Sequence, residues 1–301
     1  LMKKTKPNPA TVYLNSLSPS GRRSTQCLLT TALTLLNKRQ AIDRFRWQTL
    51  TYSDLITIKM KLQEQSKTVN TINLTLAALR GVMQSAFHLR LIKADDLLHI
   101  QSVKRLPYRP KSNGRSLNQR ECKKLIQQCV HDKSVKGIRD AALLSVMLTT
   151  GLRRNEIRNI NMADYDRLQH ELIVSCSKTH SERVCPLTTM IEKRLRAWLK
   201  VCGSTHGALF NPVLKNQKIV LRPLSTQAIY MIVQQRAVAA GLGKLTPHDL
   251  RRTYITSLLD ANVDINIVRQ LVGHRDIKTT ARYDYRIHNW HKYTKRIFAT
   301  L

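Results

Sequence analysis

Apolar residues recur at three- and four-residue steps in three stretches of the N-terminal hundred residues, a spacing typical of amphipathic helices. The first stretch follows Pro19, the second covers about 51–65, and the third runs from about 68 to 88. The polar side of the third carries Arg80. The pattern predicts a small, purely helical domain behind a frayed arm at 1–10. Its polar face either meets DNA or is merely solvated.

The rest of the chain predicts a mainly α domain with a small antiparallel β-sheet. Helices are expected at about 119–131, 137–150, 191–201 and 225–240. The second of these is almost wholly apolar, which marks it as the centre of the core, and Gly151 is placed to end it. Within 168–187, short strand-like runs flank Lys178, which predicts a hairpin.

Between the two regions, at 101–117, the helical pattern breaks. Two prolines, one glycine and five basic residues fill this stretch, so we expect an extended linker. The predicted domains are 1–103 and 118–301, joined by a basic linker at 104–117. If both domains grip one duplex, the linker crosses its backbone, where cations contact phosphates. The expected DNA contacts are Lys104, Arg105, Arg109, Lys111 and Arg115 in the linker, and Arg80 in the first domain.

The charge of the chain favours a polyanionic partner. There are 51 basic and 19 acidic residues, a net charge of +32. Up to Pro110 there are 18 basic and 5 acidic residues, and after it 33 and 14, so the two parts carry +13 and +19. Both parts are basic, as expected of two modules on one nucleic acid. Basicity for solubility alone is the weaker interpretation, because such self-repulsion destabilises a fold that has no polyanion.

Cysteine usage and hydropathy argue against other classes. The six cysteines form no C-x-x-C pair, so we expect reduced thiols and no zinc site. No apolar run approaches about 18 residues, and no signal peptide is recognisable, so no membrane span is expected. No carboxylate cluster suggests Mg²⁺. We expect a cytoplasmic, nucleoid-associated protein without a metal or another cofactor.

Candidate chemistry lies near the C-terminus. In Thr246-Pro-His-Asp-Leu-Arg-Arg252, His248 and Arg251 are three residues apart and share a helical face. Further on, His274 precedes Tyr283 by nine residues. Arginine offers phosphate oxygens a planar fork of donors, and tyrosine can be a covalent nucleophile. The pattern therefore indicates chemistry on a phosphate.

These stretches resemble the C-terminal signature of the tyrosine recombinase (phage integrase) family. Thr149-Thr-Gly-Leu-Arg-Arg-Asn-Glu-Ile157 is similar to the segment that carries the family's first catalytic arginine, and Ser177-Lys178 resembles its hairpin lysine. The resemblance covers about 117–283 well and the first hundred residues weakly. It implies a two-domain, C-shaped DNA clamp, in which a helical core-binding domain precedes a tyrosine-recombinase catalytic domain.

The resemblance also implies roles for six residues, spaced 25, 70, 3, 23 and 9 apart. Two arginines clamp the scissile phosphate, and two histidines add hydrogen bonds and handle protons. The lysine protonates the leaving 5′-oxygen, and the tyrosine forms a 3′-phosphotyrosyl link. Each residue alone fits an ordinary surface or packing role, whereas their order and spacing together favour catalysis. In chain order they are Arg153, Lys178, His248, Arg251, His274 and Tyr283.

Some positions depart from the family pattern. Ser177 and Thr179 replace the glycines that flank the family's lysine. Tyr285 competes with the tyrosine two residues earlier, although the spacing from the second histidine favours the earlier one. Glu156 is expected to orient the first arginine. Arg252, where the family often has histidine, is expected to be structural or to contact DNA.

The leading hypothesis is a site-specific DNA recombinase (integrase) of a mobile element or a resolution system, working without metal or ATP. Its expected partners are duplex recombination sites, bound by a homo-tetramer that is a monomer or weak oligomer when free. A helix at 288–301 is expected to dock on its own domain or on a neighbouring protomer. The alternatives are a non-catalytic DNA-binding protein on the same scaffold and a relaxing enzyme of the type IB topoisomerase kind.

Overall fold

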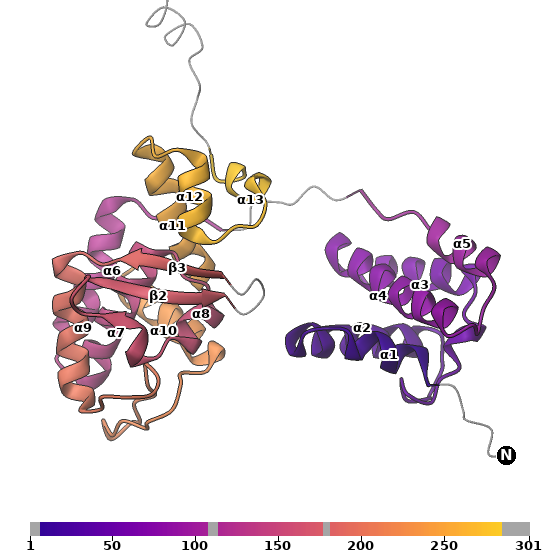
Figure 1. Ribbon diagram of the computed structural model, residues 1–301, viewed down its shortest axis with the longest axis horizontal. Coiled ribbons are helices and arrows are strands. Elements are labelled where there is room, and N and C mark those ends of the chain that lie inside the picture. Colours follow the sequence, from indigo (N-terminus) through magenta and orange to yellow (C-terminus); the bar gives the residue numbers. More distant parts are fainter. Residues whose placement is uncertain (1–6, 108–113, 177–180, 285–301) are drawn as a thin grey trace, which may run out of the picture. The chain divides into compact units, whose positions relative to one another are not determined.

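The computed structural model describes residues 7–107, 114–176 and 181–284. The chain divides into two compact units, Leu1–Lys111 (unit 1) and Ser112–Leu301 (unit 2), shown in Figure 1. Each unit has its own hydrophobic core, as expected of separate domains.

Unit 1 is helical. Its helices are α1 (Pro9–Asn15), α2 (Pro19–Leu35), α3 (Tyr52–Glu64), α4 (Val69–His88) and α5 (Ala94–Ser102), with a 3₁₀ turn at Trp47–Thr49. The side chains of Ser18, Thr51 and Thr68 accept hydrogen bonds from first-turn N–H groups of α2, α3 and α4. The central helix, α4, is covered by the other four. The three helices predicted from periodicity are therefore confirmed.

The two shortest helices of unit 1, α1 and α5, were not predicted. A frayed arm was predicted for 1–10, but the prediction is wrong for its last two residues, because α1 begins at Pro9. Asn8 explains this start, because its side-chain oxygen accepts from the N–H groups of Ala10 and Thr11. The other helix, α5, was not predicted, and an Asp96 carboxylate oxygen accepts from the N–H that precedes it.

Unit 2 packs helices against one face of a three-stranded antiparallel sheet, whose other face leaves Val184 exposed. Its elements are α6 (Gln119–His131), α7 (Val135–Thr150), α8 (Arg154–Asn159), a 3₁₀ turn (Met162–Asp164), β1 (Tyr165–Asp166), β2 (Glu171–Cys176), β3 (Ser181–Pro186), α9 (Thr189–Cys202), α10 (Thr226–Ala239), α11 (Pro247–Asp260), α12 (Ile265–Val272) and α13 (Ile277–Ala281). The strand order is β1-β2-β3. The expectation of a mainly helical fold with a small antiparallel sheet is confirmed, although β1, α12 and α13 were not predicted.

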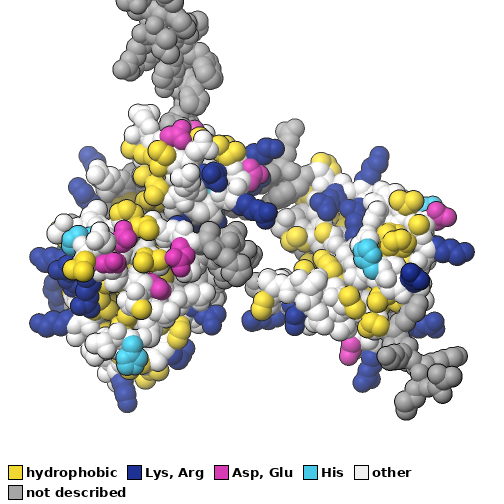
Figure 2. All heavy atoms as spheres, in the orientation of Figure 1, with side chains coloured by type: hydrophobic (Ala, Val, Ile, Leu, Met, Phe, Trp, Pro, Cys, Tyr) yellow, Lys and Arg dark blue, Asp and Glu magenta, His cyan; other side chains and the backbone are white. Residues whose placement is uncertain are grey.

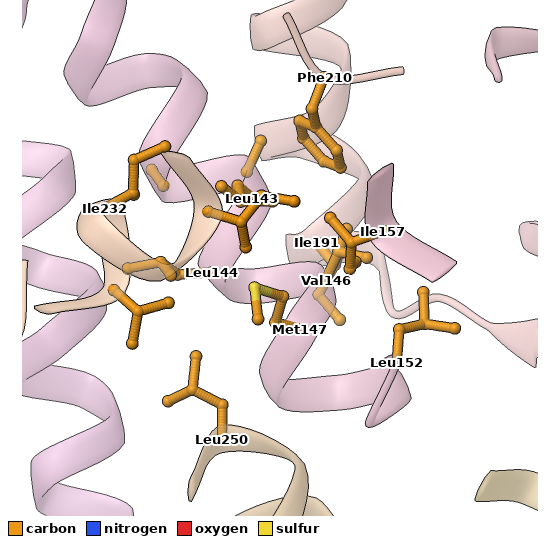
Figure 3. Close-up of a cluster of buried hydrophobic side chains, with 14 of the residues drawn as sticks. Leu143, Leu144, Val146, Met147, Leu152, Ile157, Ile191, Phe210, Ile232 and Leu250 are labelled. Atoms are coloured by element: carbon orange, nitrogen blue, oxygen red, sulfur yellow. The ribbon is translucent and has the colours of Figure 1, made fainter. Parts of the chain in front are cut away.

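The core of unit 2 is built around α7. Leu143, Leu144, Val146 and Met147 are buried on all sides of this helix, among residues of α8, α9, α10 and α11 (Figure 3). As predicted, α7 ends at Gly151, whose φ of 59° is left-handed. Only glycine fits there, because a Cβ would lie 2.5 Å from the ring of Tyr254. The buried helix thus delivers the Gly151 carbonyl and the next residues to a fixed place.

A smaller apolar cluster fixes the C-terminal part of unit 2. Ile255 and Leu259 of α11 pack with Val268 and Val272 of α12, and Tyr283 belongs to the same cluster. No helix of the described residues is long and apolar enough to cross a membrane.

Candidate active site

Five of the six predicted catalytic residues lie around one site in unit 2. They come from the start of α8, the first turns of α11, the residue after the C-cap of α12, and the segment that follows α13. The sixth, Lys178, lies outside the described residues, as does Tyr285. The five are Arg153, His248, Arg251, His274 and Tyr283.

Two arginines of the site are held in place by hydrogen bonds to backbone carbonyls. Arg153 donates from one terminal nitrogen to Glu156 Oε1 (2.8 Å) and from the other to the Gly273 carbonyl (2.9 Å). Arg251 donates to the carbonyls of Gly151 (2.6 Å) and Val272 (2.7 Å). A guanidinium has five N–H donors, so these bonds fix its plane without exhausting it. The expectation that Glu156 orients the first arginine is confirmed.

The positive charge of Arg251 is buried, since the residue is only 3% exposed. Burial first, and then the positive charge of Arg153, lower its pKa to about 9. Arg251 is still protonated at pH 7, and its charge lacks the full compensation that water would supply. Such a site favours an anion that contacts both guanidiniums.

Both histidines are held neutral at pH 7. Burial, and then the charges of Arg252 and Arg251, lower the pKa of His248. Burial, followed by Arg251 and Arg153, lowers the pKa of His274 to about 3. Nδ1 of His274 lies 2.9 Å from Thr280 Oγ1, so the ring is fixed by α13. Neutral imidazoles can accept or donate a proton within the site.

Tyr283 is in place for chemistry. The residue is buried, and its phenol oxygen lies 3.1 Å from His248 Nε2. Its ring stacks on that of His274, with 6.1 Å between centroids and 18° between planes. The guanidinium of Arg252 lies 5.1 Å from the centroid of the same ring. Arg252 therefore has a structural contact with the tyrosine, one of the two roles expected for it.

The predicted DNA contacts fall into three groups. Arg80 of α4 is half-buried and donates to the Val103 carbonyl, and Arg115 donates to Glu121 and to the Leu242 carbonyl. Both arginines are thus engaged within their own unit. Lys104 and Arg105 are exposed, and so is Arg115. The linker residues Arg109 and Lys111 lie outside the described residues.

Basic side chains also gather away from the linker. Figure 2 shows Lys and Arg clustered at the edge of unit 2 near α9. The exposed basic residues of that helix are Lys193, Arg196 and Lys200. The described residues contain no group of three His, Cys, Asp or Glu side chains able to hold a metal ion.

Arg183, on β3, belongs to the site but was not predicted to. It donates to Glu156 Oε2 (2.7 Å) and to the Leu271 carbonyl (2.5 Å). Strand alternation could have indicated it, because residues two apart in a strand share a face. Arg183 thus lies on the inward face with buried Cys185, where an arginine needs a partner.

Sequence comparison finds relatives over most of the chain. The phage integrase family model matches residues 115–288, more than half of the chain. The tyrosine recombinase XerA of Pyrococcus horikoshii is 28% identical over 77% of this chain and 75% of its own length. The tyrosine recombinase XerD of Listeria monocytogenes is 29% identical over 79% of this chain and 78% of its own length.

Solved structures share the fold at low sequence identity. A lambda integrase tetramer bound to a Holliday junction matches with a TM-score of 0.67 and 13% identity, over 93% of this chain and 78% of that one. The Tn1549 transposon integrase in complex with a circular intermediate DNA matches with a TM-score of 0.67 and 16% identity, over 96% and 99%. The family match covers the stretch in which the arginines, histidines and tyrosine meet, and the chain belongs to the phage integrase family.

Proposed function

We propose that this protein is a site-specific DNA recombinase that cuts and rejoins duplex DNA through a 3′-phosphotyrosyl intermediate on Tyr283. It is a tyrosine-type cleavage and religation enzyme. One observation carries the choice of nucleophile: the Tyr283 phenol lies 3.1 Å from a histidine nitrogen, in a site where the buried Arg251 donates to two backbone carbonyls and, within the described residues, to no carboxylate. A phenol, a base and cations are the parts required for attack on a phosphodiester.

Cleavage follows from these positions. Tyr283 Oη attacks phosphorus, so that a P–Oη bond forms while the P–O5′ bond breaks. A lowered pKa keeps the His248 ring neutral at pH 7, and in the tautomer with its proton on Nδ1 the phenol proton passes to Nε2. Arg153 and Arg251 stabilise the negative charge that gathers on the non-bridging oxygens, and His274 adds a hydrogen bond. The leaving 5′-oxygen takes a proton from Lys178, a role that rests on the family resemblance alone.

Religation reverses the same steps. A 5′-hydroxyl attacks phosphorus and gives its proton back to Lys178, so that the P–O5′ bond forms while the P–Oη bond breaks, and His248 returns the proton to the phenol. The bond energy stays in the phosphotyrosyl link, so no ATP is required. Exchange follows when the attacking 5′-hydroxyl comes from a different duplex.

Assembly on DNA is the second part of the proposal. Lambda integrase has been solved as a dimer bound to a core site and as a tetramer bound to a Holliday junction. We extend this to the present chain, as a homo-tetramer on paired duplex sites, with residues 1–103 and 118–301 as the two DNA-binding domains. The reaction serves integration and excision of a mobile element, or resolution.

Trapping a covalent protein–DNA adduct tests the nucleophile. Purified protein is incubated with nicked duplexes covering the DNA around its own gene, in EDTA, and then denatured in SDS and run on a gel. Wild type, Tyr283→Phe and Tyr285→Phe are compared. Tyr52→Phe, which removes an exposed phenol from α3, is the matched control. We expect an adduct in every lane except Tyr283→Phe.

Other outcomes would change the proposal in different ways. Loss of the adduct only in Tyr285→Phe would keep the enzyme class and move the nucleophile by two residues. Tight, sequence-specific binding without any adduct would refute catalysis and leave a DNA-binding protein on this scaffold.

A further inference from the structure

Arg183 is a buried cation with contacts to two separate elements. It lies on β3, paired across the sheet with Val174 of β2, and its side chain is only 11% exposed. One terminal nitrogen meets Glu156 of α8 and the other meets the Leu271 carbonyl of α12. An inward-facing charge is unfavourable unless it is paired. Here one partner lies on α8, which begins directly after Arg153, and the other lies on α12, which leads to His274.

The C-terminus of α12 is held by three arginines in a row. The carbonyls of Leu271, Val272 and Gly273 accept from Arg183, Arg251 and Arg153 respectively. The two carbonyls before them accept from the N–H groups of Gly273 and His274. The last carbonyls of a helix lack partners within it, and the negative end of the helix dipole lies there. Three guanidiniums therefore pair with the last carbonyls of α12 and of its C-cap residue, directly before His274 in the chain.

Glu156 is shared between two cations. Its Oε1 pairs with Arg153 at 2.8 Å and its Oε2 with Arg183 at 2.7 Å. Burial alone would raise the pKa of Glu156, but the charge of Arg183 and the bonds from Arg153 outweigh burial and hold that pKa below its ordinary value. A carboxylate paired with Arg153 alone would cancel the charge that this arginine brings to a phosphate. With Arg183 present, the cluster of three groups keeps a net charge of +1.

We propose that Arg183 is a positioning residue for the cleavage reaction, which fixes Arg153 through Glu156 and the His274 segment through the end of α12, without itself contacting DNA. The inference rests on the proposed function. It also explains why an arginine is suited to this strand position. Lysine is a point charge on a flexible stem, whereas the planar fork of arginine can meet a carboxylate and a carbonyl together.

Single-turnover cleavage at saturating DNA, with the trapped nicked duplex, tests the proposal. Arg183→Gln is expected to cleave about 10²-fold more slowly than wild type, the scale of a roughly 1 Å misplacement of catalytic groups. Its Kd for DNA stays within about threefold, because Arg183 contributes no phosphate contact. Arg183→Lys keeps the charge and recovers part of the rate. Arg167→Gln, which removes an exposed arginine from the turn between β1 and β2, is the matched control and cleaves like wild type.

Combination with Arg153→Gln separates positioning from a general loss of structure. Coupled residues are non-additive, so the double variant is expected to be less impaired than the product of the two single defects. A defect that multiplies fully, a Kd that weakens in step with the rate, or an unchanged rate in Arg183→Gln would each overturn the proposal.

A measurement without DNA keeps this inference separate from the proposed function. The Nε–Hε resonance of Arg153 reports the bonding of its guanidinium. It should shift in Arg183→Gln and stay in place in Arg167→Gln. An unshifted resonance would refute the positioning role whatever the protein does to DNA. A shifted resonance together with an inactive wild type would refute only the proposed function.

Discussion

Protonation of His274 should control the acid stability of unit 2. The residue is 6% exposed, and burial, Arg251 and Arg153 lower its pKa to about 3. In the unfolded chain the same imidazole titrates near its ordinary pKa of about 6.5. Between these two values the unfolded state binds a proton that the folded state refuses, so stability is lost as the pH falls through this window.

The size of the loss follows from the two pKa values. Between pH 7 and pH 4.5, linkage with pKa values of about 3 folded and about 6.5 unfolded removes roughly 2.5 kcal/mol of unfolding free energy. This is a large share of the 5–15 kcal/mol or so by which domains are usually stable. Carboxylates titrate in the same range, so a comparison between variants is required to isolate the histidine.

Urea unfolding at both pH values gives the measurement, read by hydrogen exchange in peptides from α11 and α12. Wild type should lose about 2.5 kcal/mol more than His274→Gln, which has no imidazole to protonate. The control His206→Gln removes an exposed histidine and should follow wild type. Equal losses in wild type and His274→Gln would show that His274 is not protected from protons in the folded state.

Three further predictions concern the supports of the site. Gly151→Ala should lower the unfolding free energy of unit 2 by roughly 2 kcal/mol, because φ is positive and Tyr254 fills the space of a Cβ. Urea unfolding measures this loss, and a loss below about 0.5 kcal/mol would contradict the prediction. Asp249→Asn should cost about 1 kcal/mol in the same assay, because the carboxylate takes the Arg115 N–H and completes the cap of α11; no loss would contradict it. Sulfate raises the Tm of folded proteins in general, but its advantage over chloride of equal ionic strength should be larger in wild type than in Arg251→Gln, since a bound anion offsets the buried charge; equal advantages would contradict the prediction.

Local signals in the sequence determined most of the secondary structure. The helices α2, α4, α6 and α7 have apolar residues at helical spacing and a capping side chain at Ser18, Thr68, Asn118 or Ser134. Caps and periodicity act within a few residues of the chain, so they can be recognised without tertiary contacts. The strands β2 and β3 were recognisable for the same reason, through the change of period around the hairpin.

The short helices of unit 2 could not be predicted from caps and periodicity. The helices α12 and α13 have eight and five residues, and isolated helices of that length are marginal in water. The stability of α12 comes from packing, since Val268 and Val272 are buried against α11. The 3₁₀ turn before β1 and β1 itself are likewise short and depend on neighbouring strands.

The chain itself determined which residues could act, because six residues in a fixed order and spacing carry the family signature. Only the tertiary structure decided what holds the site together. Residues far apart in the sequence meet at the end of α12, where Arg153 and Arg183 share Glu156. Arg115, predicted to contact DNA, also ties the end of the linker to unit 2. A buried guanidinium must find carbonyls or a carboxylate wherever the fold brings them near, and that choice is a property of packing, which no local pattern in the sequence encodes.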